Sequence, residues 1–148
     1  MSGVGRIRVA RHAEIFIDGA CLGNPGPAGI GVVLRDGPEG APRQLSKFLG
    51  PATNNLAEYL ALVYALQEAL RLRYRDVTVK SDSELLVRQT TGVYKVRDPQ
   101  LRLLQGLVRH LAEGFRTFRI EHIPREQNTQ ADRLAGEAVK RGSAAGLL

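Results

Sequence analysis

Residues 55–71 constrain the fold more than any other segment, because they form a helix with almost no polar face. Apolar side chains recur along it at helical spacing, as Leu56, Leu60, Val63, Leu66 and Leu70. Leu62, Ala65 and Ala69 fill much of the opposite side. Such a helix must be covered by other elements, so we expect it to lie deep within the protein. The chain of 148 residues can bury about two thirds of its unfolded surface as one domain.

The elements around this helix predict an α/β fold. Strand-like segments are found at 14–18, 29–35, 43–49, 77–81 and 117–122. Further helices are expected at 83–89, from a cap at Asp98 and Pro99 to about residue 113, and at 129–141, with a loop at 124–128. This order implies a five-stranded mixed sheet, with three antiparallel strands and then two parallel ones, flanked by helices. The first long helix is a crossover that brings the fourth strand beside the first.

Four acidic residues stand next to apolar elements in a way that suggests one metal site. Asp18 is the only charged residue between Ile15 and Leu34, and Glu58 is the only one from Pro51 to Leu66. The other two acids are Asp82 and Asp132. A carboxylate there loses hydration unless it is paired, hydrogen-bonded or bound to a cation. Ligands that are all oxygen select hard ions such as Mg²⁺ or Mn²⁺, and no grouping of Cys and His competes for zinc.

Helix capping is an alternative explanation for three of these acids. The spacings typical of caps are Asn55 to Glu58, Ser81 to Glu84 around Asp82, and Thr129 to Asp132. Carboxylates near helix N-termini are stabilised by about 0.3–1 kcal/mol each. Capping does not explain Asp18, which lies in or just after a strand. The residues by themselves leave both readings open, a converging cluster or unrelated caps.

Charge and cysteine content indicate which partners and which cellular compartment suit this protein. The net charge of +6 and the pI near 10.0 favour a polyanionic partner such as nucleic acid. The single cysteine, Cys21, excludes an intramolecular disulfide and fits a reducing cytoplasm. No stretch has transmembrane length, so we expect no membrane partner, and we expect a monomer. The expected organisation is a flexible basic arm over 1–13, a folded domain over 14–141 and a flexible tail over 142–148.

Four motifs together resemble the type I ribonuclease H family. They are IDGACLGNPGPAG at 17–29, TNNLAE at 53–58, VKSDS at 79–83 and NTQADRLA at 128–135. They occur in the order found in that family and cover about 15–140. Each would be weak alone, but their combination in order is specific. The resemblance implies a ribonuclease H-like catalytic domain over 14–141, in the compact subgroup that lacks a basic protrusion.

This resemblance implies a catalytic quartet of Asp18, Glu58, Asp82 and Asp132 that binds two Mg²⁺ ions, with Mn²⁺ as a substitute. In the family, the RNA strand of an RNA–DNA hybrid is hydrolysed to 5′-phosphate and 3′-hydroxyl ends. A two-metal site suits such a reaction, because it stabilises the attacking and the leaving oxygens of a phosphodiester. The expected substrate and partner is therefore an RNA–DNA hybrid duplex, and the expected function is that of an endoribonuclease.

Substrate-contacting positions also follow from the resemblance. Cys21, Asn24, Thr53, Asn54 and Asn55 match positions that line the substrate groove, where Thr53 is expected to anchor a phosphate of the DNA strand. The plainer explanation is that Asn24 belongs to a turn and that Asn54 and Asn55 cap a helix. For Cys21 we expect a backbone contact and no thiol chemistry.

The sequence departs from the family pattern at three places. Glu84 stands where many bacterial members carry a glutamine that touches RNA. Either substrate contact is weaker here or Glu84 turns outward as a capping partner, and we expect the latter. Residues 91–98 are short and lack Trp, so the hybrid is expected to be held by Lys95, Arg97 and the arm at 6–11. Many members place a mobile histidine before the last aspartate. Here we expect Arg125 to be the auxiliary catalytic cation and His122 to be a strand-end residue.

Two alternative functions remain open. One is a catalytically silent nucleic-acid-binding domain, which would require a damaged quartet, yet all four acids are present. The other is a nuclease of broader specificity that also cuts RNA duplexes, which is compatible with the short 91–98 segment. Cleavage assays on hybrid and RNA duplexes separate all three possibilities.

Overall fold

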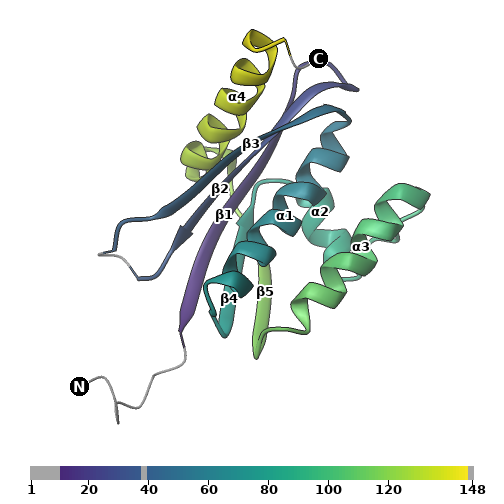
Figure 1. Cartoon of the computed structure of the whole chain (residues 1–148). Coiled ribbons are helices and arrows are strands. Elements are labelled where there is room, and N and C mark those ends of the chain that lie inside the picture. The colour runs from purple at the N-terminus through teal and green to yellow at the C-terminus, as the bar shows by residue number, and fades with distance from the viewer. Residues whose placement is uncertain (1–10, 38–39, 147–148) are drawn as a thin grey trace.

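A computed structural model describes residues 11–37 and 40–146 as one mixed sheet with helices packed against it (Figure 1). The strands are β1 (His12–Cys21), β2 (Gly26–Arg35), β3 (Arg43–Ala52), β4 (Asp76–Ser81) and β5 (Thr117–His122). Their order in the sheet is β3-β2-β1-β4-β5. The pairs β1–β2 and β2–β3 are antiparallel, and β1–β4 and β4–β5 are parallel. The expected sheet is confirmed.

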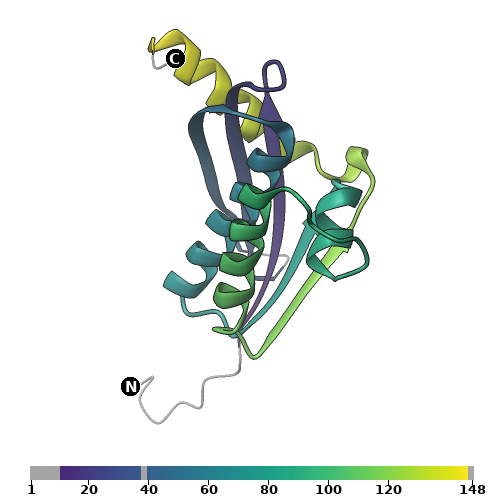
Figure 2. The same ribbon diagram turned by 90° about the vertical axis from the view of Figure 1, so that its right-hand side faces the viewer.

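Helices pack on the sheet from two sides (Figures 1 and 2). They are α1 (Asn54–Arg71), α2 (Glu84–Thr90), α3 (Pro99–Ala112) and α4 (Thr129–Ala144), with a short 3₁₀ turn, η1 (Arg125–Gln127), in the segment expected to be a loop. The crossover helix α1 lies on β1 and β2 and also contacts α3, while α4 packs on the other side of β2, β1 and β3. Over 11–37 and 40–146, no helix combines the length and apolar character needed to cross a membrane.

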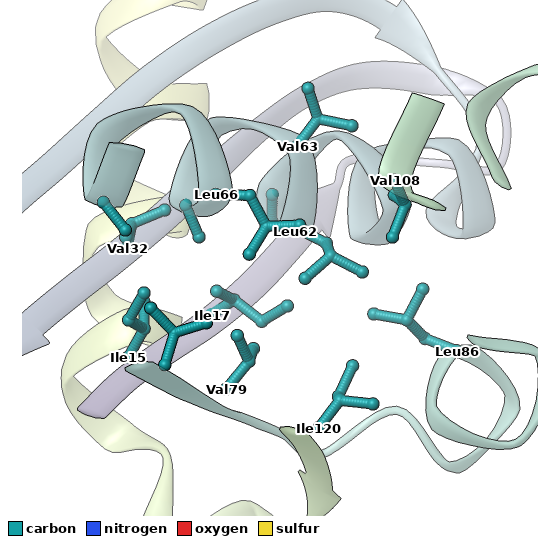
Figure 3. Close-up of a cluster of buried hydrophobic side chains, with 14 of the residues drawn as sticks. Ile15, Ile17, Val32, Leu62, Val63, Leu66, Val79, Leu86, Val108 and Ile120 are labelled. Atoms are coloured by element: carbon teal, nitrogen blue, oxygen red, sulfur yellow. The ribbon is translucent and has the colours of Figure 1, made fainter. Parts of the chain in front are cut away.

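The main core lies between α1 and the sheet. Ile15 and Ile17 of β1 and Val79 of β4 point toward Leu62 and Leu66 of α1 (Figure 3), and all five side chains are fully buried. A second cluster forms where α4 meets the sheet, with the members Phe16, Val33, Ala131 and Leu134. Because successive residues of a strand face opposite sides, β1 is buried on both. Any charged group on β1 therefore lies near apolar side chains.

A glycine on β2 brings the start of α4 close to β1. A Cβ atom on Gly31 would lie 2.8 Å from the Ala135 nitrogen and 2.9 Å from the Leu134 Cβ, which is too close for any other residue type. Gly31 is the partner of Asp18 in the β1–β2 register. The absence of a side chain on β2 thus lets the N-terminal half of α4 pack beside Asp18.

The observed elements extend beyond the predicted bounds at both ends of the domain. Strand β1 begins at His12, which pairs with Asp76 of β4, so the expected arm overlaps the sheet by two residues. Helix α4 continues to Ala144, and within this extension Gly142 is buried against the ring of Phe48, where there is no room for a side chain. The first three residues of the expected tail are therefore helical. Residues 1–10, with most of the basic arm, and 147–148 lie outside the described residues.

Candidate active site

Three carboxylates from three elements meet at one end of the parallel strands. Oxygen atoms of Asp18, Glu58 and Asp82 all lie within 4.8 Å of one another. The register explains two of them: Ile17 of β1 pairs with Ser81 of β4, so the residues that follow them, Asp18 and Asp82, are neighbours. Glu58 comes from the N-terminal part of α1. The predicted convergence of these three acids is present in the structure.

Gly19 connects the start of α1 to β1. A Cβ atom on Gly19 would lie 2.8 Å from the backbone nitrogen of Glu58, so only glycine permits this approach. The Gly19 N–H donates hydrogen bonds to Asp18 Oδ1 and to Glu58 Oε1, each at 3.0 Å. One backbone N–H thus orients both carboxylates.

The cluster carries more negative charge than its surroundings balance. Burial, followed by repulsion from Glu58 and Asp82, raises the pKa of Asp18 to about 9. Burial, followed by repulsion from Asp82, raises the pKa of Glu58 to about 8, against the lowering effects of the Gly19 N–H and of Arg125. Across 11–37 and 40–146, none of the three forms an ion pair with Lys or Arg. A divalent cation would supply the missing positive charge.

The fourth predicted acid, Asp132, stands at the edge of this cluster. It lies in the first turn of α4, is exposed, and is not one of the three acids that share the 4.8 Å group. It lies near enough to Asp18 to raise the pKa of that carboxyl further. The structure therefore brings three acids together and sets Asp132 beside one of them.

Capping does not account for these acids. Helix α1 is capped by Thr53, whose hydroxyl accepts from the Leu56 N–H at 3.1 Å, and Ser83 caps α2 in the same way. The residue at the N-cap of α4 is Asn128, with no side-chain cap bond. The alternative explanation, with capping pairs at 55–58, 81–84 and 129–132, is therefore wrong. The acids near the helix starts therefore do not serve as caps, and Glu58 and Asp82 group with Asp18 instead.

Asn128 is a site residue that the sequence analysis missed. It is 1% exposed, and its Nδ2 donates to the Ile17 carbonyl at 2.8 Å and to Asp82 Oδ2 at 3.2 Å. Within the described ranges its Oδ1 is buried and has no hydrogen-bond partner. Asparagine is common just before a helix as an N-cap, so nothing in the local sequence indicated its contact with Asp82. Its place in the 128–135 motif was the available signal.

Four of the expected substrate-contacting residues form an exposed rim beside the acids, and the fifth, Cys21, is half-buried. The Asn54 N–H donates to Asn24 Oδ1 at 2.9 Å, which joins the turn after β1 to the start of α1. Thr53 and Asn55 are exposed on the same rim. The Cys21 thiol donates to the Ala52 carbonyl at 3.0 Å and also contacts the Gly23 carbonyl, so its partners are backbone atoms.

Three residues at the departures from the family pattern also have observed positions. Arg125 lies in η1, near enough to Glu58 to lower the pKa of that carboxyl. Glu84 does not cap a helix; its carboxylate accepts from Arg88 at 2.9 Å, because Ser83 already occupies the cap position. His122 is the last residue of β5 and is exposed.

Comparison with known proteins agrees with this geometry. A sequence profile described as reverse transcriptase-like matches residues 16–138. Ribonuclease HI of Halobacterium salinarum is 43% identical over 128 residues, which are 86% of this chain and 64% of that protein. A bifunctional protein of Mycobacterium tuberculosis is 42% identical over 126 residues, 84% of this chain but 35% of its own length. The chain thus spans less than two thirds of these curated relatives.

Solved structures cover the domain more evenly. The crystal structure of RNase H1 from the archaeon Halobacterium salinarum has a TM-score of 0.84 at 40% identity and covers 88% of this chain and 98% of that one. LC11-RNase H1, solved in complex with an RNA/DNA hybrid, has a TM-score of 0.82 at 40% identity, with 88% and 98% covered. From its profile match, sequence identity and shared fold, we conclude that this chain belongs to the type 1 ribonuclease H family.

Proposed function

We propose that the protein is a metal-dependent endoribonuclease that hydrolyses the RNA strand of RNA–DNA hybrids and leaves 5′-phosphate and 3′-hydroxyl ends. The observation that carries this proposal is the group of three carboxylates, Asp18, Glu58 and Asp82, within 4.8 Å. A similar protein, LC11-RNase H1, was solved with an RNA/DNA hybrid, which supports the choice of substrate.

The donor set fits a hard divalent cation. Asp18, Glu58 and Asp82 offer only carboxylate oxygens, and Asp132 adds one more acid beside Asp18. We assign these four residues as ligands of two Mg²⁺ ions, with Mn²⁺ as a substitute. When bound, such ions supply the activation of a water molecule and the charge stabilisation of the leaving 3′-oxygen. The protein holds the acids in place through Gly19 and Asn128.

The exposed rim at the start of α1 provides substrate recognition in this proposal. Asn24, Asn54 and Asn55, together with the backbone around Cys21, offer donors and acceptors beside the metal ligands. Such groups can read the 2′-hydroxyl, which is a donor and an acceptor that DNA lacks. Thr53, which caps α1, would contact a phosphate of the DNA strand with the same hydroxyl or its backbone.

Arg125 is assigned as an auxiliary cation. Its charge already acts on Glu58, and it lies in the η1 turn that leads to Asn128 and Asp132. We assign it the role of assisting turnover at the cluster. Cleavage by Arg125→Gln should be slower than by Arg125→Lys, which keeps the charge. Equal rates for the two variants would exclude a role that depends on charge.

One assay tests the whole proposal. Labelled RNA–DNA hybrid, RNA duplex, DNA duplex and single-stranded RNA are incubated with the protein in Mg²⁺, Mn²⁺ or EDTA. We expect cleavage of the RNA strand of the hybrid in either metal and none in EDTA. Hybrid binding without cleavage would instead favour a silent binding domain, and equal cleavage of the RNA duplex would favour broader specificity.

We further propose that the protein acts as a monomer in the cytoplasm. Its one cysteine, Cys21, is free and bonds to backbone carbonyls, which suits a reducing compartment. Light scattering coupled to size-exclusion chromatography should give the mass of a single chain; the mass of a dimer would overturn the proposal.

A further inference from the structure

A hydrogen bond between two buried side chains joins α1 to α2 within the core. The Tyr59 hydroxyl donates to Gln89 Oε1 at 2.8 Å, and both residues are buried. Around this bond the core is apolar, with Leu62 of α1 and Leu86 of α2 in the same cluster (Figure 3). Apolar contacts are non-directional, whereas a hydrogen bond has a preferred length and angle. The bond between Tyr59 and Gln89 therefore fixes the orientation of α2 against α1 more sharply than packing does.

The two helices that this bond joins are attached to two acids of the cluster. Glu58 directly precedes Tyr59 in α1. Asp82 lies between the last residue of β4, Ser81, and the N-cap of α2, Ser83. The Ser83 N–H donates to Ser81 Oγ at 3.0 Å, so Asp82 sits in a short turn that is tied to both elements. A change in the orientation of α2 is thus transmitted to Asp82, while Glu58 moves with α1.

Helix α2 depends on contacts outside itself for its orientation. It has seven residues, and a helix of this length is at best marginally stable on its own in water. Its buried residues are Leu86, Val87 and Gln89. The backbone carbonyl of Gln89 also accepts a hydrogen bond from the Gln105 side chain of α3, at 3.0 Å. Gln89 is therefore the residue at which hydrogen bonds tie α2 to both α1 and α3.

Repulsion between like charges gives this restraint its importance. Glu58 and Asp82 belong to the group of acids within 4.8 Å that also contains Asp18. When they are ionised without a cation, such carboxylates repel one another, and the repulsion grows as they approach. Loosely held elements would let the two acids move apart, and a metal ion would then have to bring them together again. A site that is held in place before the ion binds loses less free energy on binding.

We propose that Tyr59 and Gln89 form a positioning pair for the metal site. The pair holds Asp82 toward Glu58 and thereby raises the affinity of the cluster for Mg²⁺. Neither side chain is one of the proposed ligands, and each acts through the helix that carries it. The inference rests on the proposed function and deepens it, because it names a restraint that keeps the metal site assembled. Asn128 bonds to Asp82 directly from the start of α4, so the pair adds a second restraint on the same acid.

The test compares Tyr59→Phe with the matched control Thr117→Val. Each substitution removes one hydroxyl that donates to a side chain at 2.8 Å, but Thr117 bonds to Asp76, at the end of β4 remote from Asp82. Two quantities are measured: the Mg²⁺ concentration for half-maximal cleavage of a hybrid, and the increase in melting temperature that Mg²⁺ produces. We expect Tyr59→Phe to raise the half-maximal concentration about tenfold, the lower end of the effect typical of partners of metal ligands. The increase in melting temperature should be smaller, the cleavage rate at saturating Mg²⁺ should stay close to that of the wild type, and the control should match the wild type throughout.

A second variant separates positioning from plain destabilisation. Tyr59→Phe alone leaves Gln89 Oε1 buried without its donor, which lowers stability whether or not the metal site is affected. Tyr59→Phe/Gln89→Leu removes both partners, so its melting temperature in EDTA should recover most of that loss. We expect its half-maximal Mg²⁺ concentration to remain raised. If the double variant regained the wild-type Mg²⁺ dependence together with its stability, the pair would be structural only and the inference would be overturned.

Failure of the proposed function gives a different result. A wild-type protein that neither cuts the hybrid nor gains melting temperature in Mg²⁺ would refute the metal-dependent nuclease. A wild-type protein that does both, with Tyr59→Phe indistinguishable from Thr117→Val, would refute the positioning pair alone.

Discussion

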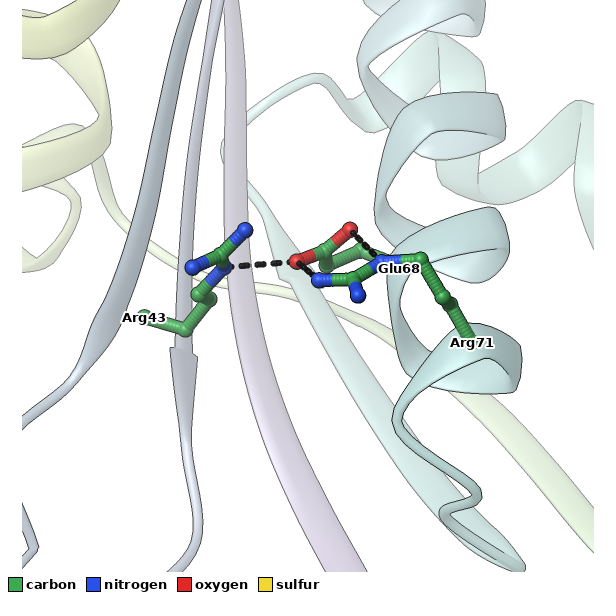
Figure 4. A network of polar contacts seen from close by, with 3 residues as sticks. All are labelled: Arg43, Glu68 and Arg71. Atoms are coloured by element: carbon green, nitrogen blue, oxygen red, sulfur yellow. Dashed lines mark hydrogen bonds and ion pairs between the residues drawn. The ribbon is translucent and has the colours of Figure 1, made fainter.

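Helix α1 carries two glutamates in opposite electrostatic settings. Near its C-terminal end, Glu68 is 8% exposed and sits between two arginines (Figure 4). Arg43 of β3 donates to it at 2.6 Å, and Arg71 donates through two nitrogens, at 3.1 and 2.7 Å. These contacts, with Arg71 contributing most, lower the pKa of Glu68. Here the protein itself supplies the counter-charge.

Near the other end of the helix, Glu58 has acidic neighbours in place of arginines. Burial and repulsion from Asp82 raise the pKa of Glu58. Burial and repulsion from Glu58 and Asp82 raise the pKa of Asp18. Asp76, on β4, resembles Glu68, because Arg116 donates to it twice and lowers its pKa. The comparison divides these carboxylates into two kinds. Glu68 and Asp76 are neutralised by arginine, whereas Asp18 and Glu58 have no such partner among the residues that the structure describes and are the residues that we propose as metal ligands.

The largest effect should come from Asp18→Asn, which removes a charge from the cluster while preserving shape. We expect the rate of hybrid cleavage in Mg²⁺ to fall by more than about a hundredfold. Mutating a residue that only orients a metal ligand already lowers activity about 10- to 100-fold, and Asp18 is proposed as a ligand itself. In EDTA, the same variant should unfold at a higher temperature than the wild type, since repulsion with Glu58 and Asp82 is relieved. Cleavage assays and thermal melts in EDTA measure the two effects.

Both halves of that result matter. A variant that is inactive because its fold is destabilised would melt at a lower temperature than the wild type in EDTA, whereas a metal-ligand variant should melt at a higher one. Normal cleavage by Asp18→Asn would sink the assignment of the cluster as the catalytic centre, whatever its stability.

The next effect concerns how the cluster is held. Asn128→Ala removes the hydrogen bond to Asp82 Oδ2, so the carboxylate is less well oriented for a metal ion. We expect the Mg²⁺ concentration for half-maximal cleavage to rise about 10- to 100-fold. The exposed neighbour Gln127 provides a control, since Gln127→Ala should leave the Mg²⁺ dependence unchanged. An unchanged dependence for Asn128→Ala would mean that Asp82 is oriented by other contacts.

Much of the fold was predictable because hydrophobic periodicity and turn residues act locally. Strand β5 was predicted at its observed bounds, and the other strands and the α-helices of the described chain were predicted within a few residues, whereas the 3₁₀ turn η1 was expected to be a loop. The strands of the first hairpin were predicted too short. Residues 19–21 and 26–28 have turn composition, yet they continue the ladder, with Cys21 opposite Ala28. Such residues become part of a strand because they pair with a neighbouring strand, and this pairing cannot be read from the local sequence.

Predictions of the site succeeded where a residue contradicted its own surroundings. Asp18 and Glu58 were found because a lone charge in an apolar segment requires a partner. Asn128 was missed because its surroundings, a helix start, suit an asparagine. The contact between Arg43 and Glu68 was equally hidden, since the two residues are far apart in sequence and neither is unusual where it stands. Long-range polar contacts leave no periodic signal.

A direct test of the comparison applies one substitution to both glutamates of α1. In EDTA near neutral pH, Glu58→Gln should raise the free energy of unfolding, because an acid that resists ionisation is replaced by a neutral group. Glu68→Gln should lower it by about 1 kcal/mol, because charge-assisted hydrogen bonds become neutral ones. Urea unfolding measures both. Mg²⁺ should then stabilise Glu68→Gln as it does the wild type, and Glu58→Gln less. If both substitutions changed the free energy of unfolding in the same direction, the two glutamates would not differ in the way that we describe.

The smallest effects should appear in the pH dependence of the metal-free protein. The ordinary pKa values of Asp18 and Glu58 are 3.8 and 4.5, and burial and mutual repulsion raise them to about 9 and about 8 in the folded state. Between these limits the folded state binds more protons than the unfolded state. Stability from these groups is therefore lost as pH rises. The lowered pKa of Glu68 acts oppositely: its contribution is present above the unfolded value and is lost as pH falls through the folded one. Urea titrations in EDTA should show Asp18→Asn flattening the alkaline decline and Glu68→Gln flattening the acid one. Parallel curves for Asp18→Asn and the wild type above about pH 5 would show that the cluster is not strained by its own charge.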